Sequence, residues 1–96
     1  MSLVADNATG TITGIQIGKI VVINLWRVAI NKKGTQIEIA RNVPKSKQRT
    51  FSVLSCESNT NSILLYHLIA DYSILAVTNV GEIGDNYFGQ IVYVTD

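Results

Sequence analysis

Two side chains suited to nucleophilic or acid–base chemistry occur once each in this 96-residue sequence, Cys56 and His67. Nucleophilic catalysis requires a thiol or hydroxyl group beside a base that a third group orients. Asp71 or Glu57 could orient His67, but nothing around Cys56 resembles a nucleophile elbow. Because the neighbours of His67 are apolar, the sequence favours a histidine of the core or of an interface. We therefore predict a protein without catalytic activity, with a small hydrolase as an alternative.

Metal and phosphate chemistry find little support in the sequence. A zinc site takes three or four thiolate, imidazole or carboxylate ligands, whereas one cysteine and one histidine form no such cluster. Residues 81–86 include two acids and an asparagine, which is a weak calcium pattern and is typical of a solvated loop. The same segment lacks the lysine and helix that follow a phosphate-binding loop. We predict no metal and no cofactor.

Polar and aromatic residues in the predicted turns are better candidates for a ligand site. Sugar sites combine amphipathic aromatic rings with amide and carboxylate groups, as ordinary interfaces also do. Tyr72 is the most suggestive aromatic residue because it lies in a turn, where a core role is least natural. Trp26 and Tyr93 lie in apolar strands and are assigned to the core or to an interface. The predicted ligand-binding residues are Tyr72, Asn59, Asn61, Asp85 and Asn86.

Charge is sparse and unevenly distributed along the chain. The net charge is +1, which argues against a nucleic-acid partner, although all eight lysines and arginines fall between Lys19 and Arg49. Lys45, Lys47 and Arg49 form a basic loop that is either simply solvated or meets an anionic polymer. Aromatic residues that would stack nucleic-acid bases are not interleaved with these charges.

Short strand-like segments separated by turn signals must position these residues. The segments are 9–16, 19–30, 36–41, 50–57, 62–70, 73–78 and 87–95. Gly10 and Gly14 indicate a bulge or a sheet edge in the first segment, and Asp71 and Tyr72 suggest a two-residue connection. A buried helix is the alternative for residues 61–70. The pattern predicts an all-β fold of about seven antiparallel strands in a jelly-roll or Greek-key barrel or sandwich.

Residues 19–30, KIVVINLWRVAI, are apolar on both faces when read with a period of two. Their β-branched residues favour a strand that is covered on both sides. Only 16% of the chain is charged, against about 25% in typical soluble domains, while 47% is hydrophobic. We therefore expect apolar surface to remain exposed until a partner covers it. No run approaches the roughly 18 apolar residues of a membrane helix, so membrane insertion is not expected.

Three segments in a characteristic order point to a family. GKIVVI at 18–23 opens a long strand after IQI at 15–17, IARNVP at 39–44 precedes a polar loop, and FGQIVYVT occupies 88–95. In this order the segments resemble the C-terminal head domains of bacteriophage, often prophage, tail and baseplate receptor-binding proteins. The resemblance covers most of the chain, roughly residues 9–95.

The resemblance implies a homotrimer of antiparallel β-barrels that binds host cell-surface saccharide near the subunit boundaries. Residues 9–96 would form a single head domain, and residues 1–8 a lead-in from a neck or an expression remnant. The chain would be made in the host cytoplasm, belong to the virion and contact other phage tail proteins. A purely structural virion component, either a baseplate connector or a capsid decoration protein, is the alternative.

Overall fold

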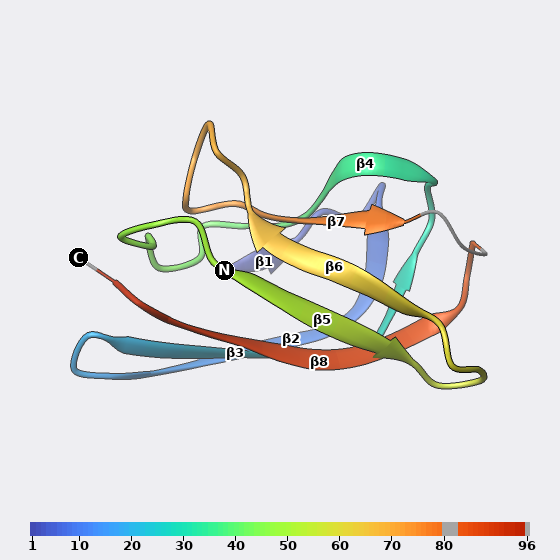
Figure 1. The fold of residues 1–96 in the computed structure, drawn as a ribbon, viewed down its shortest axis with the longest axis horizontal. Coiled ribbons are helices and arrows are strands. Elements are labelled where there is room, and N and C mark those ends of the chain that lie inside the picture. Colours follow the sequence, from blue (N-terminus) through green and yellow to red (C-terminus); the bar gives the residue numbers. More distant parts are fainter. Residues whose placement is uncertain (80–82, 96) are drawn as a thin grey trace.

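The computed structural model describes residues 1–79 and 83–95 and consists of β-strands and their connections (Figure 1). Within these residues the strands are β1 (Ser2–Leu3), β2 (Ala8–Ile17), β3 (Ile20–Ile30), β4 (Gly34–Arg41), β5 (Phe51–Cys56), β6 (Ser62–His67), β7 (Leu75–Asn79) and β8 (Asn86–Val94). The seven longer strands match the seven predicted segments to within a few residues, so the all-β prediction is confirmed. The short additional strand β1 pairs with β4.

The eight strands of the described chain form one antiparallel sheet that curls into a nearly closed barrel. Their order is β1-β4-β7-β6-β5-β8-β3-β2, and the two outermost strands, β1 and β2, contact each other. Strands β5, β6 and β7 follow one another as neighbours, and β8 returns to lie beside β5, which is the Greek-key order. The sheet therefore has an inner face that forms the core and an outer face that looks away from it.

The core consists of the inward side chains of alternating strand positions. Ile23, Leu54, Leu65, Leu75 and Tyr87 come from five different strands, and all are fully buried. Branched aliphatic side chains pack well on a pleated, half-buried surface, which explains why these segments are strands. Their burial is the main stabilising term, at about 25 cal/mol per Å² of apolar area.

A β-bulge in β3 changes which residues of that strand face inward. Trp26 and Arg27 together stand opposite the single residue Phe88 of β8. Arg27 has a left-handed φ of 50°, both bulge residues are exposed, and Val28 after them is buried again. The predicted unbroken period of two over residues 19–30 is therefore wrong beyond residue 26. The inward residues of β3 are Val21, Ile23, Leu25, Val28 and Ile30.

Gly10 of β2 makes room for this bulge. Its φ is +130°, and a Cβ atom there would lie 2.5 Å from the carbonyl oxygen of Arg27 and 2.8 Å from the Cα of Val28. Glycine alone tolerates this backbone conformation together with so close an approach. The prediction of a bulge or a sheet edge for residues 9–16 is confirmed in both respects, because β2 is also an edge of the strand order.

Residues 62–70 begin as strand β6 rather than as a helix, but the strand ends earlier than predicted. β6 ends at His67, and residues 68–74 form a loop before β7. The N–H of Leu68 donates to the carbonyl of Ile74 at 3.0 Å, and the N–H of Ile74 donates to the carbonyl of Asp71 at 3.2 Å. The predicted two-residue connection at Asp71 and Tyr72 is therefore wrong, because these local hydrogen bonds replace strand pairing.

The outer face of the sheet has two unlike parts. Thr13, Asn24 and Gln90 stand side by side across β2, β3 and β8 and form a polar row. Beyond this row, at the bulge end, lie Trp26 and Phe88. Exposed apolar side chains extend over the outer face from the β2–β3 turn to β5 and β6. We call this set the apolar half, and it consists of Ile15, Ile17, Ile20, Phe51, Val53, Leu64, Val92 and Val94.

The second face of β3 is open in the single chain. The prediction of a strand covered on both sides is therefore not met by the chain's own elements, since Ile20 is 51% exposed and Trp26 is 62% exposed.

Candidate functional site

An exposed aromatic ring lies at the bulge of β3. The ring of Trp26 is edge-on to the ring of Phe88, with centroids 4.7 Å apart and planes at 73°. The alternation of β3 places the indole on the outer face, where it contacts the ring of Phe88. The result is an open aromatic surface with a defined position.

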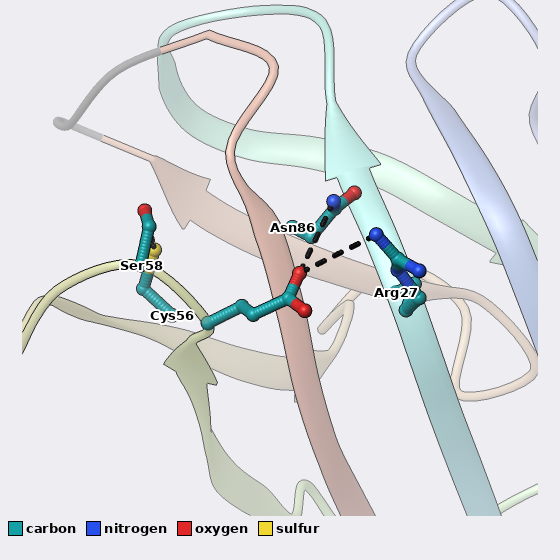
Figure 2. A network of polar contacts seen from close by, with 5 residues as sticks. Arg27, Cys56, Ser58 and Asn86 are labelled. Carbon is teal, nitrogen blue, oxygen red and sulfur yellow. Dashed lines mark hydrogen bonds and ion pairs between the residues drawn. The ribbon is translucent and has the colours of Figure 1, made fainter.

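Arg27, the residue after Trp26, belongs to a polar network with Glu57 and Asn86 (Figure 2). Oε2 of Glu57, the residue after β5, lies 3.7 Å from Nη2 of Arg27 and 3.4 Å from Nδ2 of Asn86. The N–H of Glu57 also donates to the carbonyl of Asn86 at 2.9 Å, which fixes the end of β5 against the start of β8. The side chains of Arg27 and Glu57 are 56% and 45% exposed, so both retain hydrogen-bonding positions that face solvent.

Four of the five predicted ligand residues lie at this end of the barrel. Asn59 and Asn61 belong to the β5–β6 turn, whereas Asp85 precedes β8 and Asn86 begins it. Oδ1 of Asn59 accepts the N–H of Asn61 at 2.8 Å, so this oxygen shapes the turn. Oδ2 of Asp85 is buried and has no hydrogen-bond partner among the described residues. Of the four, Asn86 is the one that contacts Glu57 directly.

Tyr72 lies at the opposite end of the barrel, in the β6–β7 loop (Figure 1). It lines an open polar depression with Lys45 and Lys47 of the β4–β5 connection. Asp71 beside it accepts hydrogen bonds from the hydroxyl and the N–H of Ser73, at 2.6 and 2.9 Å, and these bonds hold the pKa of its carboxyl below the usual value. The structure therefore does not bring the five predicted residues into one site.

The residues weighed for hydrolysis lie far apart. His67 is fully buried, its ring nitrogens make no hydrogen bonds among the described residues, and burial lowers its pKa to about 4. Cys56 lies at the other end of the β5–β6 hairpin, about 20 Å away at the usual rise per strand residue. Sγ of Cys56 instead lies 3.6 Å from Oγ of Ser58. A Cys56–His67 pair is therefore not formed.

Metal-binding and membrane-spanning features were also sought in residues 1–79 and 83–95. No group of three or more His, Cys, Asp and Glu side chains is placed there to hold a metal ion. The weak calcium pattern at 81–86 falls in part on residues 81 and 82, outside the described residues. No helix in this part of the chain is long and apolar enough to cross a bilayer.

The sequence did not reveal Trp26, Arg27 and Glu57 as neighbours in one site. A tryptophan inside an apolar strand is ordinarily a core or interface residue, but Trp26 continues the outward positions of Ile20 and Asn24 and is exposed in the single chain. The available signal was Gly10, because a glycine within a strand indicates a bulge or a close backbone approach. The residues of β3 that lie opposite Gly10 depend on the register between β2 and β3. The approach of Glu57 depends on the pairing of β5 with β8, which are not consecutive in the chain.

Comparisons with protein-family models, with curated proteins and with solved structures give no match. The features that bear on function are therefore those of the molecule itself: the barrel, the Trp26–Phe88 pair and the network around Glu57.

Proposed function

We propose that this chain is a non-catalytic binding module that recognises a saccharide at the bulge end of its barrel. The observation that carries the proposal is Trp26, whose side chain is 62% exposed and lies against Phe88. The C–H face of a sugar ring packs on an exposed aromatic ring. Sugar hydroxyl groups hydrogen-bond to carboxylate, guanidinium and amide groups, which Glu57, Arg27 and Asn86 supply next to the indole.

The resemblance to phage head domains suggests the setting of this activity. In that setting the chain is a homotrimer on a phage tail or baseplate, and the saccharide belongs to the host cell surface. Three weak sites on one rigid trimer, repeated over many trimers per particle, give an avidity that no single site has. The apolar half of the outer face supports the association of copies.

A structural virion component, such as a baseplate connector or a capsid decoration protein, is the second candidate. The observation that favours it is the same apolar half, because a neighbouring protein in a particle would also cover such a surface. A structural component needs no affinity for saccharides. Measured binding therefore separates the two candidates.

The decisive experiment is binding of the full chain to a glycan array and to isolated host cell walls, with two matched variants. We expect Trp26→Ala to lose at least about tenfold in affinity, equivalent to about 1.4 kcal/mol, because the stacking surface is gone. Tyr72→Ala, at the opposite end of the barrel, should bind like the wild type. Thermal unfolding would show that both variants remain folded.

Two outcomes would contradict this proposal. Binding to no saccharide and to no cell wall would favour the structural role. Loss of binding in Tyr72→Ala but not in Trp26→Ala would move the site to the depression beside Lys45 and Lys47.

A further inference from the structure

The apolar half is an extended surface whose eight side chains carry no charge. Its eight residues come from β2, β3, β8, β5 and β6, which are neighbours in the sheet. Ile17 faces Ile20 and Ile20 faces Val94 across the ladders, while Val53 faces Leu64. Ile15 and Val92 lie on either side of Val22, and β5 pairs with β8, so the two groups of side chains lie on adjoining strands of one face. None of the eight residues is charged.

No element of the described chain is left to cover this surface. All eight strands belong to the one sheet, and their inner faces are already used in the core. The apolar half is rich in branched aliphatic residues, as are the inner faces of β-sandwiches, where two sheets pack about 10 Å apart. Its composition therefore fits a second sheet better than a helix or a charged peptide.

The size of the surface approaches what one partner contributes to a stable association. Each of its members is between 39% and 73% exposed. Eight such side chains, at about 150 Å² each, leave on the order of 600 Å² of apolar area in contact with water. The largest apolar patch of a typical monomer measures about 300–600 Å², and each partner in a standard interface contributes about 800 Å². The apolar half thus lies at the upper limit for a monomer and supplies most of a subunit interface.

We infer that the apolar half is the interface between copies of this chain. The eight side chains themselves carry no charge, although Lys47 and Arg49 border them, and a second copy offers an uncharged sheet of the same kind. The border is polar, with Asn24 and Gln90 on one side and Arg49, whose guanidinium carbon lies 5.0 Å from the ring centroid of Phe51, on another. An apolar centre with a polar rim is the usual anatomy of an interface.

This inference deepens the proposed assembly of the binding module, because it names the surface through which copies meet. It is tested by the mass of the full chain in solution, measured by light scattering over a dilution series. The wild type should give a multiple of the 10.5 kDa monomer mass. Val53→Lys and Val92→Lys should each give the monomer mass, because a lysine would be buried without a partner in the interface but solvated in the monomer.

Ile69→Lys is the matched control. Ile69 is 67% exposed, but it lies in the β6–β7 loop and not on the strands that form the apolar half, so this variant should keep the wild-type mass. A wild type that is monomeric at every concentration would overturn the inference. Association of Val53→Lys and Val92→Lys like that of the wild type would also overturn it.

A second measurement needs no variant. Hydroxyl-radical footprinting of the wild type should show that Val92 and Val94 become protected as concentration rises, whereas Ile69 does not; equal labelling of all three would also overturn the inference. Saccharide binding is measured independently of mass. An oligomer without saccharide affinity would therefore refute the proposed function and leave this interface standing.

Discussion

The imidazole ring of His67 stands edge-on to the phenol ring of Tyr93 inside the barrel, with centroids 4.4 Å apart and planes at 82°. The hydroxyl of Tyr93 donates to the carbonyl of Pro44 at 2.5 Å, which fixes the phenol. Burial raises the pKa of Tyr93 to about 12 and lowers that of His67 to about 4, so both rings are neutral at pH 7. His67 is a packing residue of the core.

The buried histidine predicts acid-sensitive stability. Because the pKa of His67 falls from 6.5 to about 4 on folding, the unfolded chain binds more protons between these pH values. The free energy of unfolding is therefore unaffected by the titration of His67 above pH 6.5 and decreases as the pH falls toward 4. The total decrease that His67 causes is about 3 kcal/mol. Urea unfolding at pH 7, 5 and 4 measures this loss.

The control for this prediction is His67→Leu, which places an apolar side chain at this core position and removes the titrating imidazole. Its stability should change less between pH 7 and pH 4 than that of the wild type. Asp71 also has a lowered pKa, but this residue is present in both proteins and therefore does not contribute to the difference between them. Parallel loss in the two proteins would show that His67 is not the cause.

Gly10 is expected to be indispensable for the bulge. Gly10→Ala places a Cβ atom 2.5 Å from the carbonyl oxygen of Arg27 and imposes a φ of +130° on alanine, at an expected cost of about 2–4 kcal/mol in unfolding free energy. Gly34→Ala is a matched control, because φ there is +129° and nothing lies within 4 Å of the new atom. Thermal or urea unfolding should show the larger loss in Gly10→Ala, and equal losses would refute the steric explanation.

The hydroxyl of Tyr66 is expected to support a strained residue in β4. It accepts the N–H of Gln36 at 2.9 Å, and Gln36 has a left-handed φ of 54°. Tyr66→Phe leaves that N–H without its partner and should cost about 1–2 kcal/mol in unfolding free energy. Tyr72→Phe should cost much less, because the hydroxyl of Tyr72 makes no such bond within the described residues. Chemical unfolding of the two variants compares them directly, and similar stability of both would contradict the assigned role.

Arg27 is expected to matter for binding and not for stability. Its pair with Glu57 is exposed, and exposed ion pairs contribute about 0–1 kcal/mol. Arg27→Ala should therefore unfold like the wild type but bind saccharide several-fold more weakly. Arg41→Ala removes another exposed pair, Arg41–Glu38 at 3.2 Å, away from the Trp26 site, and should leave affinity unchanged. Calorimetric titration of both variants tests this difference, and unchanged affinity in Arg27→Ala would remove Arg27 from the site.

The strands were predictable because β-branched residues, turn signals and glycines act locally. The bulge was predictable only in part, since Gly10 signals an irregularity but does not name Trp26 and Arg27 as the residues displaced. One displaced residue reverses the inward and outward positions that follow, which is why Val28 and Ile30 point into the core. The β6–β7 loop was misjudged because a run of apolar residues does not show where pairing ends.

The candidate site depends on contacts that no local pattern contains. Turn composition drew attention to Asn86, whose side chain contacts Glu57, but it also grouped Tyr72 with residues at the far end of the barrel. Which turns share an end follows from the strand order, and β5 and β8 are neighbours although a hairpin and β7 separate them in sequence. Glu57 meets Arg27 and Asn86 only through that pairing.

Asn24 and Gln90 face each other across β3 and β8, between the apolar residues near the β2–β3 turn and Trp26. A subunit that dries the surface on one side of this pair would have to strip hydration from both amides before it reached the indole of Trp26, and dehydrating unpaired amides is costly. In such an assembly the indole would therefore stay in solvent. Each chain that joins would then add an accessible docking position to the particle instead of hiding one.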